Sequence, residues 1–286
     1  RLDFPNNKVT KSFEQNLDNL SLSNVYLREY INSRMNNAEY NRCLKNMVAL
    51  KASYEGQFNC RPANEHLSNT PLIQAMVALE PLTKEFRQKN NLDLVNLVIV
   101  HDGDADNVNA RIEEKTGYDN ETYVGGSYFD ISSTNVYIKD RDSKLQVKVE
   151  SCINDSYYNV EDGLRVGIFD WYRAATGSKI FGFFIAGEGR EMRQQLTAKY
   201  INKDGESVYE MIDKKYNLTS TNNRYFDYDK SEFVKALASQ VKKDKFIQSY
   251  NKGYDSFFIM PGGSELKVED EELEIEGKVT ASKLKT

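Results

Sequence analysis

The stretch that decides the fold reads Asn96-Leu97-Val98-Ile99-Val100-His101-Asp102-Gly103-Asp104. A short apolar run rich in β-branched residues ends there on an acidic turn that contains glycine. Such a run is typical of a strand that is buried on both faces of a parallel sheet. Ligands and ions collect just beyond the carboxyl ends of the strands in open α/β sheets, so the pattern predicts that Asp102 lies at such a place.

A second informative stretch, Leu67-Ser68-Asn69-Thr70-Pro71-Leu72, lies upstream and begins an apolar helical segment. Proline fits the first position of a helix, where its missing N–H costs nothing, and Thr70 is expected to cap the helix. We expect Pro81 to kink or end this helix, because proline cannot donate the next backbone hydrogen bond.

The first part of the chain has helical patterns, followed by an interruption with strand character. The patterns predict an N-terminal helical segment over residues 1–66, with helices at 23–34 and 37–50. A further short helix is predicted over residues 108–115. Residues 134–139 and 145–149 each alternate apolar and polar side chains around a turn-forming Arg141-Asp142-Ser143. This alternation predicts an antiparallel β-hairpin, inserted at about 120–156.

After the hairpin, the alternation of helices and strands returns. Strands are expected at residues 179–186 and 254–260, and helices at 160–175, 190–201, 207–216 and 229–250. Alternating strands and helices predict an α/β fold with a doubly wound, mostly parallel sheet. We assign the α/β core to residues 67–263 and a charged C-terminal tail to residues 264–286.

Taken together, the Thr-Pro-Leu helix start and the apolar strand ending in Asp-Gly resemble the von Willebrand factor A family, which has a Rossmann-like fold. The resemblance implies a metal-ion-dependent adhesion site for Mg²⁺, to which Thr70 contributes a hydroxyl and Asp102 a carboxylate. Asp104 is the third candidate metal ligand. In the family, the open position of the ion accepts a carboxylate from a partner protein. The expected function is therefore non-catalytic, divalent-metal-dependent protein–protein interaction.

The chain departs from the family in one respect, because the Asp-x-Ser-x-Ser signature that supplies serine hydroxyls to the ion is absent. The nearest serine pair, Ser21-Leu22-Ser23, has no aspartate two residues before Ser21. Two explanations stay open. Either the first strand lies N-terminal to Arg1 in the native protein, or the site has decayed and the domain binds without metal. The start at Arg1 rather than at methionine favours the first explanation.

Within the family, the stretches Ser68-Asn69-Thr70-Pro71-Leu72 and Phe184-Ile185-Ala186-Gly187-Glu188-Gly189 are similar to cobalt-chelatase-type domains, some labelled peptidases, encoded by large tailed phages. This resemblance implies a viral protein that works with a MoxR-type AAA+ ATPase, in the cytoplasm of the infected host or in the virion. No residue supports the peptidase label, because the two histidines, His66 and His101, do not make a zinc-peptidase motif.

Three alternatives to metal-dependent adhesion remain open. The Asp102-x-Asp104 pair also resembles the acidic magnesium cluster of topoisomerase–primase folds, which would make the protein a magnesium-dependent nuclease or primase-like enzyme. That class needs a glutamate on an earlier strand, and none stands out. A calcium loop would use Asp102, Asp104 and Asp106 with Glu113 at the twelfth position, but Asn107 replaces the required glycine. The third alternative is a structural virion component.

Composition narrows the classes of partner. The net charge is −5, with acidic and basic residues interspersed, which does not favour a surface for duplex nucleic acid. No apolar run approaches the ~20 residues that cross a bilayer, so no membrane span is expected. Cys43, Cys60 and Cys152 are odd in number and widely spaced, as expected of reduced thiols. The sequence predicts no catalytic residue and no organic cofactor.

Overall fold

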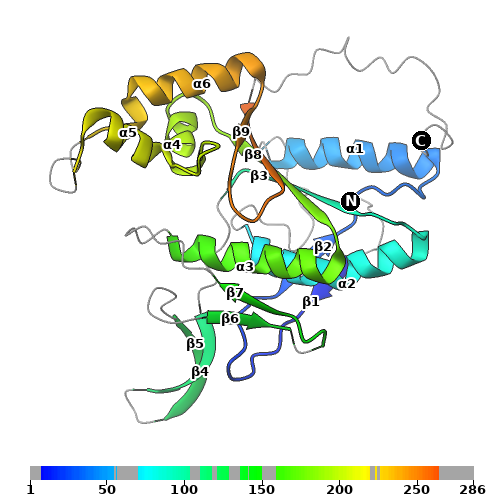
Figure 1. Ribbon diagram of the computed structural model, residues 1–286. Coiled ribbons are helices and arrows are strands. Elements are labelled where there is room, and N and C mark those ends of the chain that lie inside the picture. Colours follow the sequence, from blue (N-terminus) through cyan, green and yellow to red (C-terminus); the bar gives the residue numbers. More distant parts are fainter. Residues whose placement is uncertain are drawn as a thin grey trace. The chain divides into compact units, whose positions relative to one another are not determined.

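The computed structural model describes residues 8–54, 56, 70–103, 110–117, 121–128, 136–140, 142–149, 159–219, 223 and 226–263 (Figure 1). The chain forms two compact units. Unit 1 comprises Arg1–Val95 and Gly103–Ser178, and unit 2 comprises Asn96–Asp102 and Lys179–Thr286. The two units divide the core assigned to residues 67–263, because residues 67–95 group with the N-terminal segment. The tail assigned to residues 264–286 lies outside the described residues.

Unit 2 contains a four-stranded sheet in the order β3-β8-β10-β9. Strands β3 (Asn96–His101), β8 (Lys179–Ala186) and β10 (Ser256–Pro261) are parallel, and β9 (Ile247–Ser249) is antiparallel to β10. The predicted mostly parallel α/β sheet is therefore confirmed. Strand β9 was not predicted, because the helical pattern was extended to residue 250. The helix ends at Asp244, since the next residue, Lys245, has the left-handed φ of 65°.

One face of this sheet is covered by helices α4 (Gly189–Lys199), α5 (Val208–Tyr216) and α6 (Glu232–Asp244). Alternate residues of β8 and β10 face these helices, as the two-residue period of a strand requires. Their buried side chains form a single apolar core, which contains Phe184, Ala186, Met192, Leu196, Val208, Ile212, Val234, Leu237, Ala238, Val241, Ile247, Phe257 and Ile259. The second helical layer of a doubly wound sheet stays a prediction.

The serine before each of the last two helices fixes where that helix begins. Ser207 caps α5 in a complete capping box with Glu210, and the Ser231 hydroxyl accepts a hydrogen bond from the Val234 N–H at the start of α6. The capping box expected at residues 229–232 was wrong in detail. A short 3-10 helix, η2 (Tyr228–Lys230), occupies that position, and the cap lies one residue before Glu232.

Strand β3 differs from its predicted environment. The apolar run was expected to be buried on both faces, but Val98 is 56% exposed and Val100 is 64% exposed. The reason lies in the topology, because β3 pairs with β8 on one side and no other strand among the described residues pairs with its outer side. An apolar run does not by itself distinguish a central strand from an edge strand.

In its described residues, unit 1 combines three helices with three two-stranded antiparallel sheets. The helices are α1 (Asn37–Tyr54), α2 (Leu72–Asn90) and α3 (Asn159–Thr176). The sheets pair β1 (Lys8–Lys11) with β2 (Val25–Arg28), β4 (Ala110–Thr116) with β5 (Thr122–Tyr128), and β6 (Val136–Lys139) with β7 (Gln146–Val149). Helix α3 packs against α2 on one side and against the β6–β7 hairpin on another (Figure 1).

The predicted hairpin and the helix after it are confirmed as β6–β7 and α3, and the helix predicted over residues 37–50 is confirmed as α1. Gly167 lets α3 approach the hairpin closely. A Cβ atom at this position would lie 3.1 Å from Ile138 Cδ1 and 3.3 Å from Val149 Cγ2. A larger residue at 167 would therefore push the helix away from the hairpin.

Two predicted helices are wrong. Residues 25–28 form β2 instead of part of a helix over 23–34, and residues 110–116 form β4 instead of a helix over 108–115. Each segment is too short for its side-chain pattern to distinguish the 3.6-residue period of a helix from the two-residue period of a strand. Backbone pairing of β2 with β1, and of β4 with β5, makes both segments strands. Pro81 does not end its helix, since α2 continues to Asn90. Among the described residues, no helix has the length and apolar character needed to span a membrane.

Candidate functional site

The carboxyl ends of the three parallel strands of unit 2 form one edge of its sheet. Asp102 follows β3 and is exposed, Gly187-Glu188-Gly189 follows β8, and Gly262-Gly263 follows β10. Strands β3 and β8 are adjacent and in register, with His101 beside Phe184. This edge therefore brings Asp102 and Glu188 to the ends of neighbouring strands, where ligands of open α/β sheets bind.

The ring of His101 is anchored in the core of unit 2. It lies edge-on to Phe184, with ring centroids 5.3 Å apart, and 6.2 Å from the ring of Phe257. His101 therefore packs at the strand end. Because this packing fixes the last residue of β3, Asp102 extends from an ordered strand end.

In unit 1, Thr70 lies two residues before Leu72, the first residue of α2. It does not cap that helix, because the N-cap residue is Pro71 and no side chain makes a capping hydrogen bond. The Thr70 carbonyl accepts a hydrogen bond from the Leu72 N–H, at 2.7 Å. The Thr70 hydroxyl lies against Gly103, where a Cβ atom would be 2.6 Å from Thr70 Oγ1. The cap prediction is therefore wrong, and the hydroxyl contacts the turn that follows β3.

We expect Gly103→Ala to destabilise the protein, because its methyl group would overlap the Thr70 hydroxyl. Overpacking of this kind costs about 1–3 kcal/mol, measurable by urea unfolding. Thr70→Ala removes the overlapping oxygen, so Gly103→Ala in that background should cost much less. Equal costs of Gly103→Ala in both backgrounds would show that the contact is absent in solution.

The other predicted ligands of this turn cannot be compared with the structure. Asp104 lies outside the described residues, as does His66. Glu113, the twelfth position of the calcium-loop alternative, lies on β4 and forms an ion pair with Arg111. A calcium loop of that class is followed by a helix, so the strand at this position argues against it.

Two carboxylates that were not among the predicted site residues, those of Glu188 and Glu191, lie at this edge. The Glu188 carboxylate packs against the backbone of Gly263, and the Glu191 carboxylate packs against the backbone of Gly187. The Gly187 N–H donates to Gln195 Oε1 at 2.6 Å. Each carboxylate occupies space that a side chain at Gly263 or Gly187 would fill, so these two glycines were the available signal.

No group of three or more His, Cys, Asp or Glu side chains suited to a metal occurs among the described residues. The chemistry of the predicted ligands is that of a magnesium site, because a threonine hydroxyl and an aspartate carboxylate both offer the oxygen ligands that Mg²⁺ accepts, and Mg²⁺ keeps several waters besides.

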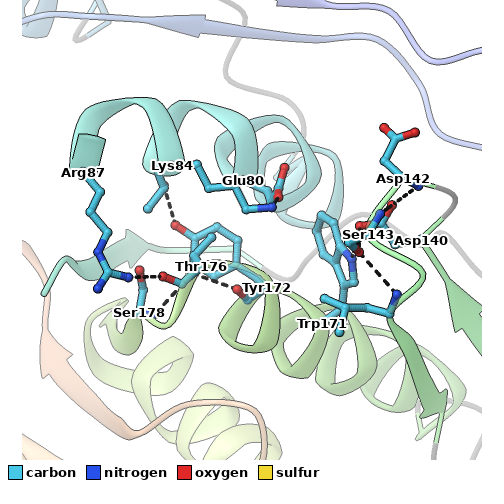
Figure 2. Close-up of polar contacts among 12 residues, drawn as sticks. Glu80, Lys84, Arg87, Asp140, Asp142, Ser143, Trp171, Tyr172, Thr176 and Ser178 are labelled. Atoms are coloured by element: carbon cyan, nitrogen blue, oxygen red, sulfur yellow. Dashed lines mark hydrogen bonds and ion pairs between the residues drawn. The ribbon is translucent and has the colours of Figure 1, made fainter. Parts of the chain in front are cut away.

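A separate polar cluster lies between α2 and α3 in unit 1 (Figure 2). Arg87 donates to three backbone carbonyls, Leu92 at 3.1 Å, Asp93 at 2.5 Å and Thr176 at 3.1 Å. A shallow hollow of about 440 Å³ lies beside it, lined by Lys84, Arg87, Gln88, Asn91, Leu92, Ala175 and Thr176. Because the guanidinium group already binds these carbonyls, we assign Arg87 a structural role that joins the C-terminal ends of the two helices.

Asp140 is the centre of the β6–β7 turn in the same unit. It accepts hydrogen bonds from the Asp142 N–H at 2.9 Å, from Trp171 Nε1 at 3.2 Å, and from the Ser143 hydroxyl (Figure 2). Partial burial raises the pKa of Asp140, but these hydrogen bonds outweigh it and lower the pKa below its usual range. The carboxylate therefore ties the hairpin turn to α3.

Because the pKa of Asp140 is lower in the folded than in the unfolded chain, its ionised form stabilises the fold. This contribution is present above the ordinary Asp pKa of about 3.9 and is lost as the pH falls through the lower, folded value. We expect Asp140→Asn to reduce stability at pH 7, with the difference from the parent shrinking below about pH 4. Thermal unfolding at several pH values tests this, and a constant difference would contradict it.

Comparisons of the chain with protein-family models, with curated proteins and with solved structures return no match.

Proposed function

We propose that the protein is a non-catalytic, divalent-metal-dependent protein-binding module of the von Willebrand factor A type. Thr70, Asp102 and Asp104 are the proposed ligands of a Mg²⁺ ion. One observation carries the proposal: Thr70 and Gly103, which belong to the two motifs that resemble the family, lie so close that a Cβ atom added at Gly103 would be 2.6 Å from Thr70 Oγ1. Asp102 is joined to Gly103 by one peptide bond.

The chemistry of these ligands is consistent with adhesion. A hydroxyl and one or two carboxylates leave several positions of a Mg²⁺ ion to water, and a carboxylate of a partner protein can replace a water there. The ion would supply the positive charge that attracts that carboxylate. Asp102 is exposed, as an ion shared with a second protein requires.

The finer fold and context belong to the same proposal. The parallel order β3-β8-β10 supports a doubly wound, Rossmann-like sheet, to which a second helical layer would belong. By resemblance, the protein is phage-encoded and acts with a MoxR-type AAA+ ATPase, in the host cytoplasm or in the virion. A pull-down of a purified ATPase of that type, with Mg²⁺ and with EDTA, tests the partnership.

The metal site is tested by titrating Mg²⁺ and Mn²⁺ into the protein by calorimetry. We expect saturable binding that Asp102→Ala abolishes and that Thr70→Val weakens by about tenfold or more, since each removes one ligand. Asp244→Ala is the matched control, because Asp244 is an exposed aspartate of unit 2 at the end of α6. Absence of binding in the parent protein would reject the metal site.

The enzymatic alternative uses Asp102 and Asp104 as magnesium ligands of a nuclease or primase-like enzyme. It requires a glutamate on an earlier strand, and the earlier described strands β1 and β2 contain only Lys8-Val9-Thr10-Lys11 and Val25-Tyr26-Leu27-Arg28. Incubation with single-stranded DNA and Mg²⁺ distinguishes the two functions. Cleavage that disappears in Asp102→Ala would favour the enzyme, and stoichiometric recovery from purified particles would favour a structural virion component.

A further inference from the structure

Arg87 holds together two segments of unit 1 that lead directly into neighbouring strands of unit 2. The chain passes from unit 1 into unit 2 at Asn96, where β3 begins, and again at Lys179, where β8 begins. The Arg87 guanidinium donates to the Asp93 carbonyl at 2.5 Å and to the Thr176 carbonyl at 3.1 Å, the second of which is drawn in Figure 2. One side chain therefore binds both segments just before the chain enters the sheet.

The two bound carbonyls lie at equal distances along the chain from their strands. Asp93 is three residues before Asn96, and Thr176 is three residues before Lys179. Asn96 and Lys179 are partners in the parallel register of β3 with β8. The hydrogen bonds of Arg87 therefore align the first residues of the two strands in the way in which they are paired in the sheet.

Both segments leave their helices with a defined backbone geometry. Each helix is followed by a residue in the left-handed conformation, Asn91 with a φ of 49° after α2 and Gly177 with a φ of 70° after α3. The Gly177 N–H donates to the Arg173 carbonyl at 2.8 Å. Gly177 also leaves room for the guanidinium, because a Cβ atom added there would be 3.3 Å from Arg87 Nη1. Arg87 therefore binds two ordered segments.

The apolar side chains of β3 do not select this register by themselves. A shift by two residues keeps each side chain on the same face of the sheet, because side chains alternate along a strand. The run Leu97-Val98-Ile99-Val100 has a branched apolar side chain at every position, so such a shift replaces one apolar contact with another. The shift would move the start of β3 by about 6–7 Å relative to β8, which is farther than the Arg87 hydrogen bonds can stretch.

We propose that Arg87 fixes the register in which β3 pairs with β8. The guanidinium joins segments that are far apart in the sequence, since residues 102–178 lie between the two strands. Its planar set of donors binds both carbonyls at once in a single alignment of the segments. Because this alignment sets where β3 ends, it also sets where Asp102 begins the turn. The proposal holds whether or not Asp102 binds a metal ion.

Disulfide cross-linking between the strands measures the register. Val98 lies beside Phe181 in the observed register, so Val98→Cys with Phe181→Cys reports that register. A shift by two residues brings position 98 beside 183 or position 100 beside 181, which Val98→Cys with Phe183→Cys and Val100→Cys with Phe181→Cys report. Mass spectrometry of the linked peptides after mild oxidation identifies each bond. We expect the 98–181 bond to predominate strongly in the protein with Arg87 intact.

Replacing Arg87 should change the balance between these bonds. In an Arg87→Ala background, we expect the ratio of the 98–181 bond to the two shifted bonds to fall by about tenfold or more, since hydrogen bonds from a charged donor are among the stronger ones. Arg87→Lys keeps the charge but not the planar donors, so it should lower the ratio to an intermediate extent. It also keeps the test informative if Arg87→Ala does not fold.

Asp140→Asn is the matched control for a general loss of stability. Asp140 accepts a hydrogen bond from Trp171 Nε1 at 3.2 Å, so the change weakens unit 1 at a place that Arg87 does not touch. The ratio should stay that of the parent, because a loss of stability alone does not select a register. An unchanged ratio in both Arg87 variants, an equal fall in Asp140→Asn, or no 98–181 bond with Arg87 intact would overturn the proposal.

Discussion

Phe184→Ala is expected to destabilise unit 2 by about 3–5 kcal/mol, the usual cost of truncating a fully buried phenylalanine. Phe184 is 0% exposed and lies in the core between β8 and the helices. The ring also contacts His101 edge-on, and Lys199 Nζ lies 4.8 Å from its centroid. Its removal would leave a cavity beneath the end of β3, where the candidate site begins.

Urea unfolding followed by far-ultraviolet circular dichroism measures this loss, and hydrogen exchange of the β8 amides locates it in unit 2. Phe246→Ala is the matched control, because Phe246 has the same side chain but is 51% exposed. It should cost less than about 1 kcal/mol. If the two variants were equally stable, the assigned core of unit 2 would be wrong.

Because the Phe184 ring contacts His101, the residue before Asp102, we also expect Phe184→Ala to weaken Mg²⁺ binding.

Arg87→Ala is expected to destabilise unit 1 by about 2–3 kcal/mol, since hydrogen bonds to charged groups are among the stronger ones in proteins. The guanidinium group donates to the carbonyls of Leu92, Asp93 and Thr176, so its removal frees the C-terminal ends of α2 and α3 together. Its positive charge also interacts favourably with the negative, C-terminal ends of both helix dipoles.

The fluorescence of Trp171, the single tryptophan of the chain, reports this unfolding because Trp171 lies on α3 in unit 1. Arg42→Ala, at an exposed arginine on α1, is the control and should change stability by less than about 0.5 kcal/mol. Arg87→Lys keeps the charge but not the planar set of donors, so we expect an intermediate loss. A loss no greater than that of the control would contradict the structural role of Arg87.

The candidate site shows how far residue patterns alone can lead. The sequence indicated Thr70 and Asp102 from two separate motifs, and the structure brings Thr70 into contact with the residue after Asp102. The same pattern wrongly predicted a capping role for Thr70, because the helix begins one residue later than expected. Glu188 was missed, since the direction of its carboxylate depends on Gly263, which is distant in the sequence.

Elements whose sequence signals are local and long could be predicted from the residues alone. Helix α3 and strand β8 follow from sustained side-chain periods, and the β6–β7 hairpin follows from alternation around a polar turn. Tertiary contacts were needed to show that β3 pairs on one side alone among the described strands, that residues 110–116 pair as β4, and that the Thr70 hydroxyl contacts Gly103. The physical reason is the same in each case, because a strand's neighbours and a hydroxyl's contacts are set by residues far away in the chain, which a local pattern does not contain.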